Sequence, residues 1–218
     1  MMISPETYYK ENLKGKTKKQ IMTVIRSLKQ EIGRLKNIVE HPDYVCTMCP
    51  SEQVRISCYR DYLERAKLAF IEAGGNYAPS ASEKKAMEFD ANIQFISKVV
   101  LHIGGQLTGY ETRTYTIHGD KVYADFEHSL IIKPSNISDD NVGSMDKDYF
   151  LEKLKALHIG EWRKHYDTSR FSIVILDGTQ WCLEIYFSNG YKTVKIQGDN
   201  SFPYNFDRLL DIFEAEEI

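Results

Sequence analysis

The spacing of apolar residues changes once along this chain of 218 residues, and that change constrains the fold more than any other feature. Up to about residue 90, apolar side chains recur every three or four positions, which is the period of an amphipathic helix. Beyond that point, apolar and polar residues alternate in short runs, which is the period of a half-buried strand. We therefore expect an α+β fold in which a helical region, residues 1–90, precedes an antiparallel α+β domain, residues 91–218.

Two long helices are predicted in the first region, because each has a capping residue at its start and a helix-ending dipeptide after it. Thr17 and Ser51 are the predicted N-caps, and His41-Pro42 and Gly74-Gly75 end the two helices. The short connection between them predicts an antiparallel helical hairpin. The apolar stripe of the first helix consists of Ile21, Val24, Ile25, Leu28, Ile32, Leu35, Ile38 and Val39.

The second region predicts an antiparallel sheet with two packed helices. Residues 110–118 and 122–127 alternate around Gly119-Asp120, and Asn189-Gly190 marks a second hairpin between residues 181–188 and 192–197. We expect a further strand at residues 171–176 and a loop at residues 134–143.

Serines and apolar spacing place the remaining helices. Ser144 is expected to cap one packed helix, and residues 206–213 carry the apolar spacing of the other. Ser82 is expected to cap a helix that closes the first region near Phe89.

Charge is distributed unevenly between the two regions. The chain has a formal net charge of -3, but residues 1–40 contain nine Lys and Arg against four Glu. A basic helix of this kind suits a phosphate backbone or an acidic protein surface, and a solvated helix face with no partner is the alternative. The predicted contact residues on this helix are Lys18, Lys19, Arg26, Lys29 and Arg34.

Aromatic residues mark a second predicted contact surface. With 14 Tyr, 10 Phe and 2 Trp, the chain has enough rings to leave some outside the core. Tyr110, Arg113, Tyr115 and Tyr123 lie on the predicted hairpin, where such a mixture suits a protein interface or base stacking. Ordinary cross-strand packing is the alternative.

A cluster of cysteines suggests a structural zinc site. His41, Cys46, Cys49 and Cys58 supply an imidazole and three thiols, which suit tetrahedral zinc and would clamp the helical hairpin. The usual second Cys-x-x-Cys pair is missing, and the alternatives are an iron–sulfur cluster, redox chemistry at Cys46 and Cys49, and reduced cysteines without metal. Cys182 is expected to be structural.

Support for an enzyme is weak. His158, Glu161 and His165 have helical spacing and would suit a metal-dependent hydrolase or nuclease, although Gly160 interrupts the segment. The glycines at residues 104–109 lack the Gly-Lys-Ser/Thr ending of a phosphate-binding loop.

Hydropathy and the first residues predict a cytoplasmic protein. No uninterrupted apolar stretch reaches the roughly 18–20 residues that span a bilayer. The first residues lack the basic, apolar and small-residue zones of a secretion signal.

The C-terminal sequence carries a distinctive block of residues. Residues 176–185 read LDGTQWCLEI, and Asn189-Gly190, the run GDNSFP at 198–203 and Phe206 follow. This block resembles a recurrent C-terminal module of uncharacterised bacterial proteins, many of which look like cargo of mobile elements. The likeness covers residues 20–135 more weakly. The resemblance implies no catalytic residue; because such cargo includes inhibitors of host defence such as anti-CRISPR proteins, it implies an anti-defence role by association.

These observations favour a non-enzymatic interaction protein whose target is a protein or a protein–nucleic-acid complex, with direct nucleic-acid contact through the basic helix. A zinc-stabilised nucleic-acid-binding module and a metal-dependent hydrolase or nuclease are the alternatives.

Overall fold

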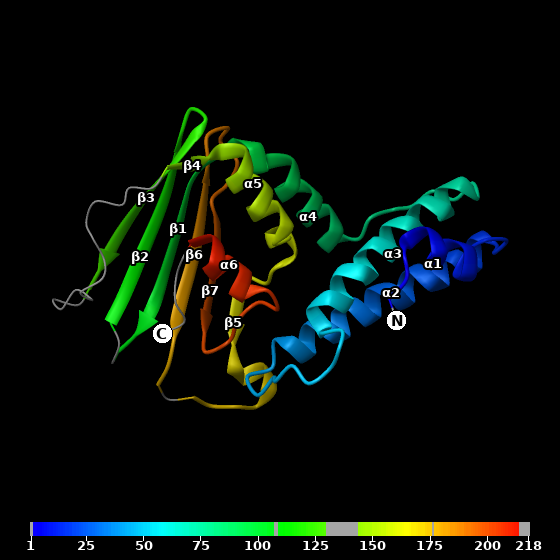
Figure 1. The fold of residues 1–218 in the computed structure, drawn as a ribbon, viewed down its shortest axis with the longest axis horizontal. Helices are drawn as coiled ribbons and strands as arrows, with labels where there is room; N and C mark the ends of the chain where they lie inside the picture. The colour runs from blue at the N-terminus through cyan, green and yellow to red at the C-terminus, as the bar shows by residue number, and fades with distance from the viewer. Residues whose placement is uncertain (1, 107–108, 130–143, 176, 214–218) are drawn as a thin grey trace. The chain divides into compact units, whose positions relative to one another are not determined.

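The computed structural model describes residues 2–106, 109–129, 144–175 and 177–213 (Figure 1). The chain forms two compact units, Met1–Pro79 and Ser80–Ile218, which we call the helical unit and the sheet unit. The α+β class is confirmed, but the units divide earlier than residue 90, because helix α4 (Ala81–Asn92) belongs to the sheet unit. There α4 packs on the 3-10 helix η2 (Ile159–Glu161) so closely that a Cβ on Gly160 would lie 2.8 Å from the Ala86 Cα.

The helical unit contains α1 (Pro5–Asn12), α2 (Lys18–Val39) and α3 (Glu52–Glu72). The predicted caps are confirmed, since the Thr17 side chain accepts the Gln20 amide of α2 and the Ser51 side chain accepts the Val54 amide of α3. Helices α2 and α3 pack along each other as the predicted hairpin. Its buried apolar residues are Ile21, Ile25, Leu28, Ile32 and Leu35 of α2 and Ile56, Tyr62, Leu63, Ala66, Ala69 and Phe70 of α3.

The described strands of the sheet unit form one sheet in the order β4-β3-β2-β1-β6-β7-β5. They are β1 (Ile96–Gly105), β2 (Gly109–His118), β3 (Lys121–His128), β4 (Ser144–Asp146), β5 (His165–Asp167), β6 (Gln180–Phe187) and β7 (Val194–Asp199). Neighbouring strands are antiparallel, except that β5 runs parallel to β7. Both predicted hairpins are confirmed, with Thr116 opposite Tyr123 in the first and Ile185 opposite Val194 in the second.

Several predicted element boundaries are wrong, because stronger caps lie nearby. Ser80 caps α4 in place of Ser82, since Ser80 and Glu83 form a complete capping box. Asp146 caps α5 (Lys147–Ala156) by accepting two backbone amides, and Ser144 instead lies in β4. The strand expected at residues 171–176 is absent from residues 171–175, where the 3-10 helix η3 (Thr168–Phe171) ends; residue 176 and the expected loop at 134–143 lie outside the described residues.

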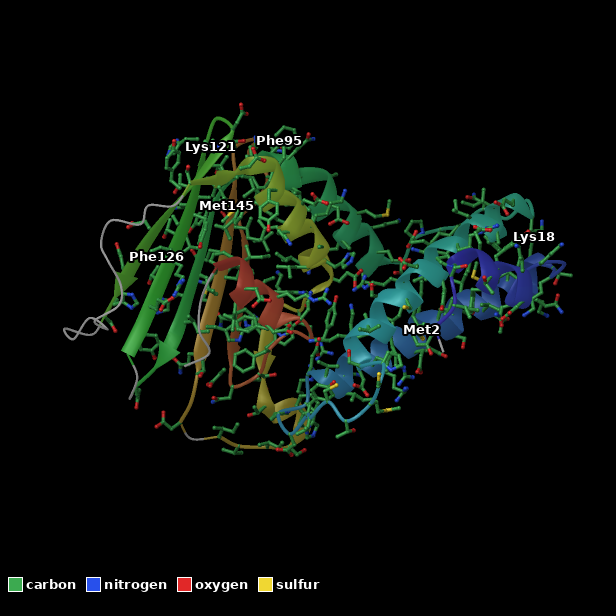
Figure 2. The ribbon with its side chains drawn as sticks, in the orientation of Figure 1. Met2, Lys18, Phe95, Lys121, Phe126 and Met145 are labelled. Atoms are coloured by element: carbon green, nitrogen blue, oxygen red, sulfur yellow. The ribbon has the colours of Figure 1, made fainter. Side chains whose placement is uncertain are left out.

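Helices α4, α5 and α6 (Phe206–Phe213) cover the same face of the sheet (Figure 1). On that face the Tyr115 ring stacks on Phe150 of α5, and Trp181 contacts Phe206 of α6. Figure 2 marks Phe126 on β3 and Met145 on β4, which pack against the margin of this core. Within the sheet unit, no described helix packs on the opposite face, which we call the open face.

Across the parts of the chain that the structure describes, every helix is too short or too polar to span a membrane.

Candidate functional site

Five exposed lysines surround the turn from α1 into α2, and we call this surface the basic corner. Its members are Lys10, Lys14, Lys16, Lys18 and Lys19. Leu13, 2% exposed, anchors the turn from inside, and the Tyr8 ring of α1 stacks on Tyr62 of α3 at a centroid distance of 4.2 Å. Glu11 is the only acidic residue between Lys10 and Lys19, so the turn that leads to Lys18, which Figure 2 marks, is rich in positive charge.

The other basic residues predicted on α2 differ in whether their side chains are already bound by other residues of the helical unit. Arg34 donates two hydrogen bonds to Glu31, at 2.8 and 2.7 Å, and these hold the pKa of Glu31 below its ordinary value. The Lys29 ammonium lies 5.2 Å from the ring centre of Tyr77. Arg26 is exposed, and none of the described residues is bonded to its side chain. Arg26 therefore extends the basic corner along α2, whereas Arg34 is engaged within the unit.

Two of the four predicted contact residues on the hairpin face the core. Tyr115 is 2% exposed and packs among Phe126, Phe150 and Phe213, so it is a core residue and not a contact residue. Arg113 lies on the same face, where it pairs with Glu111 and donates to the Phe213 carbonyl at 2.6 Å. The Arg113 guanidinium therefore lies at the edge of the core, beside the end of α6.

The other two predicted hairpin residues lie on the open face. Tyr123 is 42% exposed on β3. Tyr110 stacks on His102 of β1 at 5.1 Å, and its hydroxyl donates to the Gln180 side chain at 3.0 Å. Tyr123 is therefore accessible, whereas Tyr110 is held by its neighbours.

The four candidate zinc ligands lie in and beside the loop between α2 and α3. Cys46 and Cys49 are exposed in the loop, Cys58 is half-buried on α3, and all are free thiols. The His41 ring accepts the Asp43 amide at 3.2 Å. Within the described ranges, no three His, Cys, Asp or Glu side chains are grouped to hold a metal ion. Zinc at these residues stays a prediction, which elemental analysis of protein purified without chelator would test.

No helix carries His158, Glu161 and His165 on one face in the described structure. His158 has a left-handed backbone with a φ of +52°, Glu161 ends η2, and His165 lies on β5. The interruption at Gly160 permits the close approach of α4. The shared helical face predicted for a metal-dependent hydrolase or nuclease is therefore wrong.

A polar network on the open face is centred on Glu184 of β6. Its carboxylate accepts hydrogen bonds from Lys195 of β7, at 2.7 Å, and from the Tyr186 hydroxyl. Lys98 of β1 lies 4.4 Å from the Tyr186 ring centre. Lys195, followed by Tyr186, holds the pKa of Glu184 below its ordinary value. Strand alternation puts Glu184 and Tyr186 on one face, but only the register of β1, β6 and β7 brings the lysines to them.

Cys182 and His102 are cross-strand neighbours on the same face. The His102 Nδ1 hydrogen-bonds to the Thr112 hydroxyl at 2.8 Å. Burial raises the pKa of the Cys182 thiol, which favours the protonated, weakly nucleophilic form. We therefore interpret Cys182 and His102 as polar residues of the open face, because the described contacts do not activate the Cys182 thiol as a nucleophile.

The distinctive C-terminal residues join the start of β6 to the segment between β7 and α6. The Thr179 amide donates to the Asn200 side chain at 2.8 Å, and the Asn200 amide donates back to the Thr179 carbonyl at 2.9 Å. Asn200 has a φ of +50°, a backbone conformation that Asn tolerates better than most residues. The Trp181 indole donates to the Ser201 carbonyl at 2.9 Å. These residues therefore have a structural role.

Comparison of the chain with protein-family models, with curated proteins and with solved structures finds no match.

Proposed function

We propose that this chain is a non-enzymatic interaction protein that binds a macromolecular target through the basic corner and Arg26. The concentration of exposed lysines at the start of α2 carries the proposal. Glu31, the only acidic residue of α2, is already paired with Arg34 and lies 3.5 Å from Arg55, so it does not offset this charge. The positive charge of the basic corner and Arg26 is therefore available to bind a partner.

The target we propose is a nucleic acid held in a protein–nucleic-acid complex. Lys19 and Arg26 are separated by about 10 Å along the axis of α2, at 1.5 Å per residue. Duplex DNA carries one charge for about every 1.7 Å of its axis, so an extended row of cations can contact several phosphates at once. An acidic protein surface seldom has charge at this density.

A narrower role, inhibition of a host-defence nuclease in the manner of anti-CRISPR proteins, is part of the same proposal. Its support is the resemblance of the C-terminal block to modules in mobile-element cargo, which is an association and not site chemistry. We place the interaction in the cytoplasm, where the free thiols of Cys46, Cys49, Cys58 and Cys182 would stay reduced.

Charge reversal of the basic surface tests the proposal. The variant Lys18→Glu/Lys19→Glu/Arg26→Glu should bind a fluorescently labelled DNA duplex at least about tenfold more weakly than the unaltered chain in anisotropy titrations. A series of salt concentrations adds a second readout, since the slope of log affinity against log salt should lose about 0.9 for each phosphate contact removed.

The matched control is Lys84→Glu/Lys153→Glu/Lys155→Glu, which changes the charge equally at exposed positions of the sheet unit. It should keep both the affinity and the salt slope. Equal weakening by the two variants would show that net charge, and not the basic surface, controls binding. The proposal also fails if the charge-reversed variant retains every partner that the unaltered chain captures from a host lysate.

A further inference from the structure

Residues 172–175, which we call the apolar segment, leave apolar side chains in water. They read Ser-Ile-Val-Ile, follow η3 directly and belong to no helix or strand of the sheet unit. Figure 1 draws them as a plain trace between η3 and β6. Val174 is 82% exposed, more than any other large apolar side chain among the described residues, and Ile175 is 40% exposed. Two adjacent β-branched side chains therefore lie uncovered at the surface.

The sequence of the apolar segment disagrees with its conformation. Val and Ile are strong strand formers, so a run of them predicts a strand, yet residues 172–175 pair with none of the described strands. In natural chains, a segment whose local preference conflicts with its structure often marks a functional position. What this segment lacks is a neighbouring strand.

The backbone of the apolar segment is bonded only at its start. The Ser172 amide donates to the Ser169 carbonyl at 2.9 Å, and the Ile173 amide donates to the Thr168 carbonyl at 3.3 Å. Neither Val174 nor Ile175 forms a hydrogen bond with a described residue. A strand alongside residues 174 and 175 would bond this backbone and cover the exposed side chains together.

We propose that the apolar segments of two copies of this chain pair as antiparallel strands about a twofold axis. Side chains alternate along a strand, so Ile173 and Ile175 of both copies lie on one face of the pair and Val174 on the other. Arg170 precedes the segment and Asp177 follows it. Antiparallel pairing brings these opposite charges together at each end, whereas parallel pairing would align like charges.

The edges of the sheet are poor alternative neighbours for the apolar segment of a second copy. The strands at the two ends of the described sheet, β4 and β5, are only three residues long. Residues 124–128 of β3 extend beyond β4, but Asp125 and Glu127 are exposed there. Short strands and charged side chains both protect an edge against strand addition. The matching apolar segment is therefore the occupant we assign.

The predicted dimer is weak and depends on concentration. Two segments of this length bury less than the roughly 1,000 Å² of a stable interface. A dimer carries two copies of the basic corner, and two linked contacts bind one nucleic acid more tightly than either contact alone. Strand pairing itself uses no residue of the basic corner, so it does not depend on the proposed function.

Sedimentation equilibrium of the full chain tests the pairing. Between about 1 μM and about 1 mM, the unaltered chain should pass from monomer towards dimer. Val174→Asp should raise the dissociation constant of the dimer at least about tenfold, because it places a carboxylate of each copy in the apolar pair. The matched control Val45→Asp changes a valine of the helical unit that is 72% exposed, and it should leave the constant unchanged.

A chain that stays monomeric over the whole concentration range would overturn the proposal, as would equal weakening by Val174→Asp and Val45→Asp.

Single prolines separate strand pairing from contact between side chains. Adjacent amides of a strand point to opposite sides, so only one of residues 174 and 175 donates to the partner strand. Proline has no amide hydrogen, so either Val174→Pro or Ile175→Pro should abolish the dimer while the other weakens it much less. Equal effects of the two prolines would assign the dimer to side-chain contact and contradict strand pairing.

The charge-reversed variant separates this inference from the proposed function. Lys18→Glu/Lys19→Glu/Arg26→Glu should form the dimer as tightly as the unaltered chain, even where it loses duplex binding. Val174→Asp at concentrations where all chains are monomeric should bind the duplex as the unaltered chain does. Loss of the dimer in the charge-reversed variant would show that the copies meet through the basic corner, and the apolar segment would then not be the interface.

Discussion

The helical unit and the sheet unit differ in the range of the contacts that define their helices and strands. In the helical unit, caps such as Thr17 with Gln20 and the ion pair of Arg34 with Glu31 join residues three positions apart. In the sheet unit, β1 pairs with β6 although β2 to β5 lie between them in sequence. Local contacts can be read from spacing, whereas long-range pairing is set by the register of the whole sheet.

The two units also use their charges differently. Residues 1–79 contain 13 Lys and Arg against 9 Asp and Glu, and most of the surplus lies on the exposed basic corner. On the open face of the sheet unit, charges are tied into a network around Glu184. The exposed surplus of positive charge is thus concentrated in the helical unit.

Core truncations should produce the largest effects and show whether the units unfold separately. Leu35 of α2 and Leu183 of β6 are both 0% exposed, so changing either to Ala should cost about 2–5 kcal/mol of its unit's unfolding free energy. Both tryptophans lie in the sheet unit. In urea titrations, Leu183→Ala should therefore shift the transition seen by tryptophan fluorescence. Leu35→Ala should shift only the helical transition seen by circular dichroism.

A fluorescence midpoint that moves equally in Leu35→Ala and Leu183→Ala would mean that the two units unfold as one.

Glycine substitutions should have opposite signs in the two units. A Cβ on Gly198 of β7 would overlap the Trp181 indole and the Ser201 carbonyl, so Gly198→Ala should destabilise the sheet unit by about 1–3 kcal/mol. Gly33 lies within α2, where an added Cβ would meet no other atom within 4 Å, so Gly33→Ala should stabilise the helical unit by about 0.5–1 kcal/mol. The same urea titrations measure both. Stabilisation by Gly198→Ala would show that the contact between β7 and Trp181 is looser than the structure has it.

The smallest expected effect is pH-dependent and concerns Glu184. Because Lys195 and Tyr186 lower its pKa in the folded chain, the carboxylate stabilises the sheet unit above the ordinary Glu pKa of about 4.3. This stability is lost as the pH falls through the lowered folded pKa. Glu184→Gln should cost about 0.5–1 kcal/mol at neutral pH, a value kept small by solvent screening, and progressively less as the pH falls below the ordinary Glu pKa.

The partner variant Lys195→Gln should show the same pH trend with a smaller amplitude, because Tyr186 still donates to the carboxylate. A loss on Glu184→Gln that is constant from neutral to acidic pH would assign the effect to packing instead of charge.

Spacing and capping chemistry predicted much of the fold and little of the candidate sites. The helices after Thr17 and Ser51 and the turns at Gly119 and Gly190 follow from rules that act over a few residues. Strands β4 and β5, three residues each, were not predicted, because so short a segment has no measurable period and is defined by its neighbour in the sheet. The polar network around Glu184 likewise joins residues of β1, β6 and β7 that no local pattern connects.

The sequence alone determined the α+β class, the polarity of charge and the two alternating faces of residues 110–117. It could not determine which of those faces would be buried, since each carries an aromatic residue, Tyr110 on one and Tyr115 on the other. Helices α5 and α6 decided this by covering the face of Tyr115, which left Tyr110 on the open face. Alternation defines the two faces of a strand, but which face is buried is decided by the helices, distant in sequence, that pack on it.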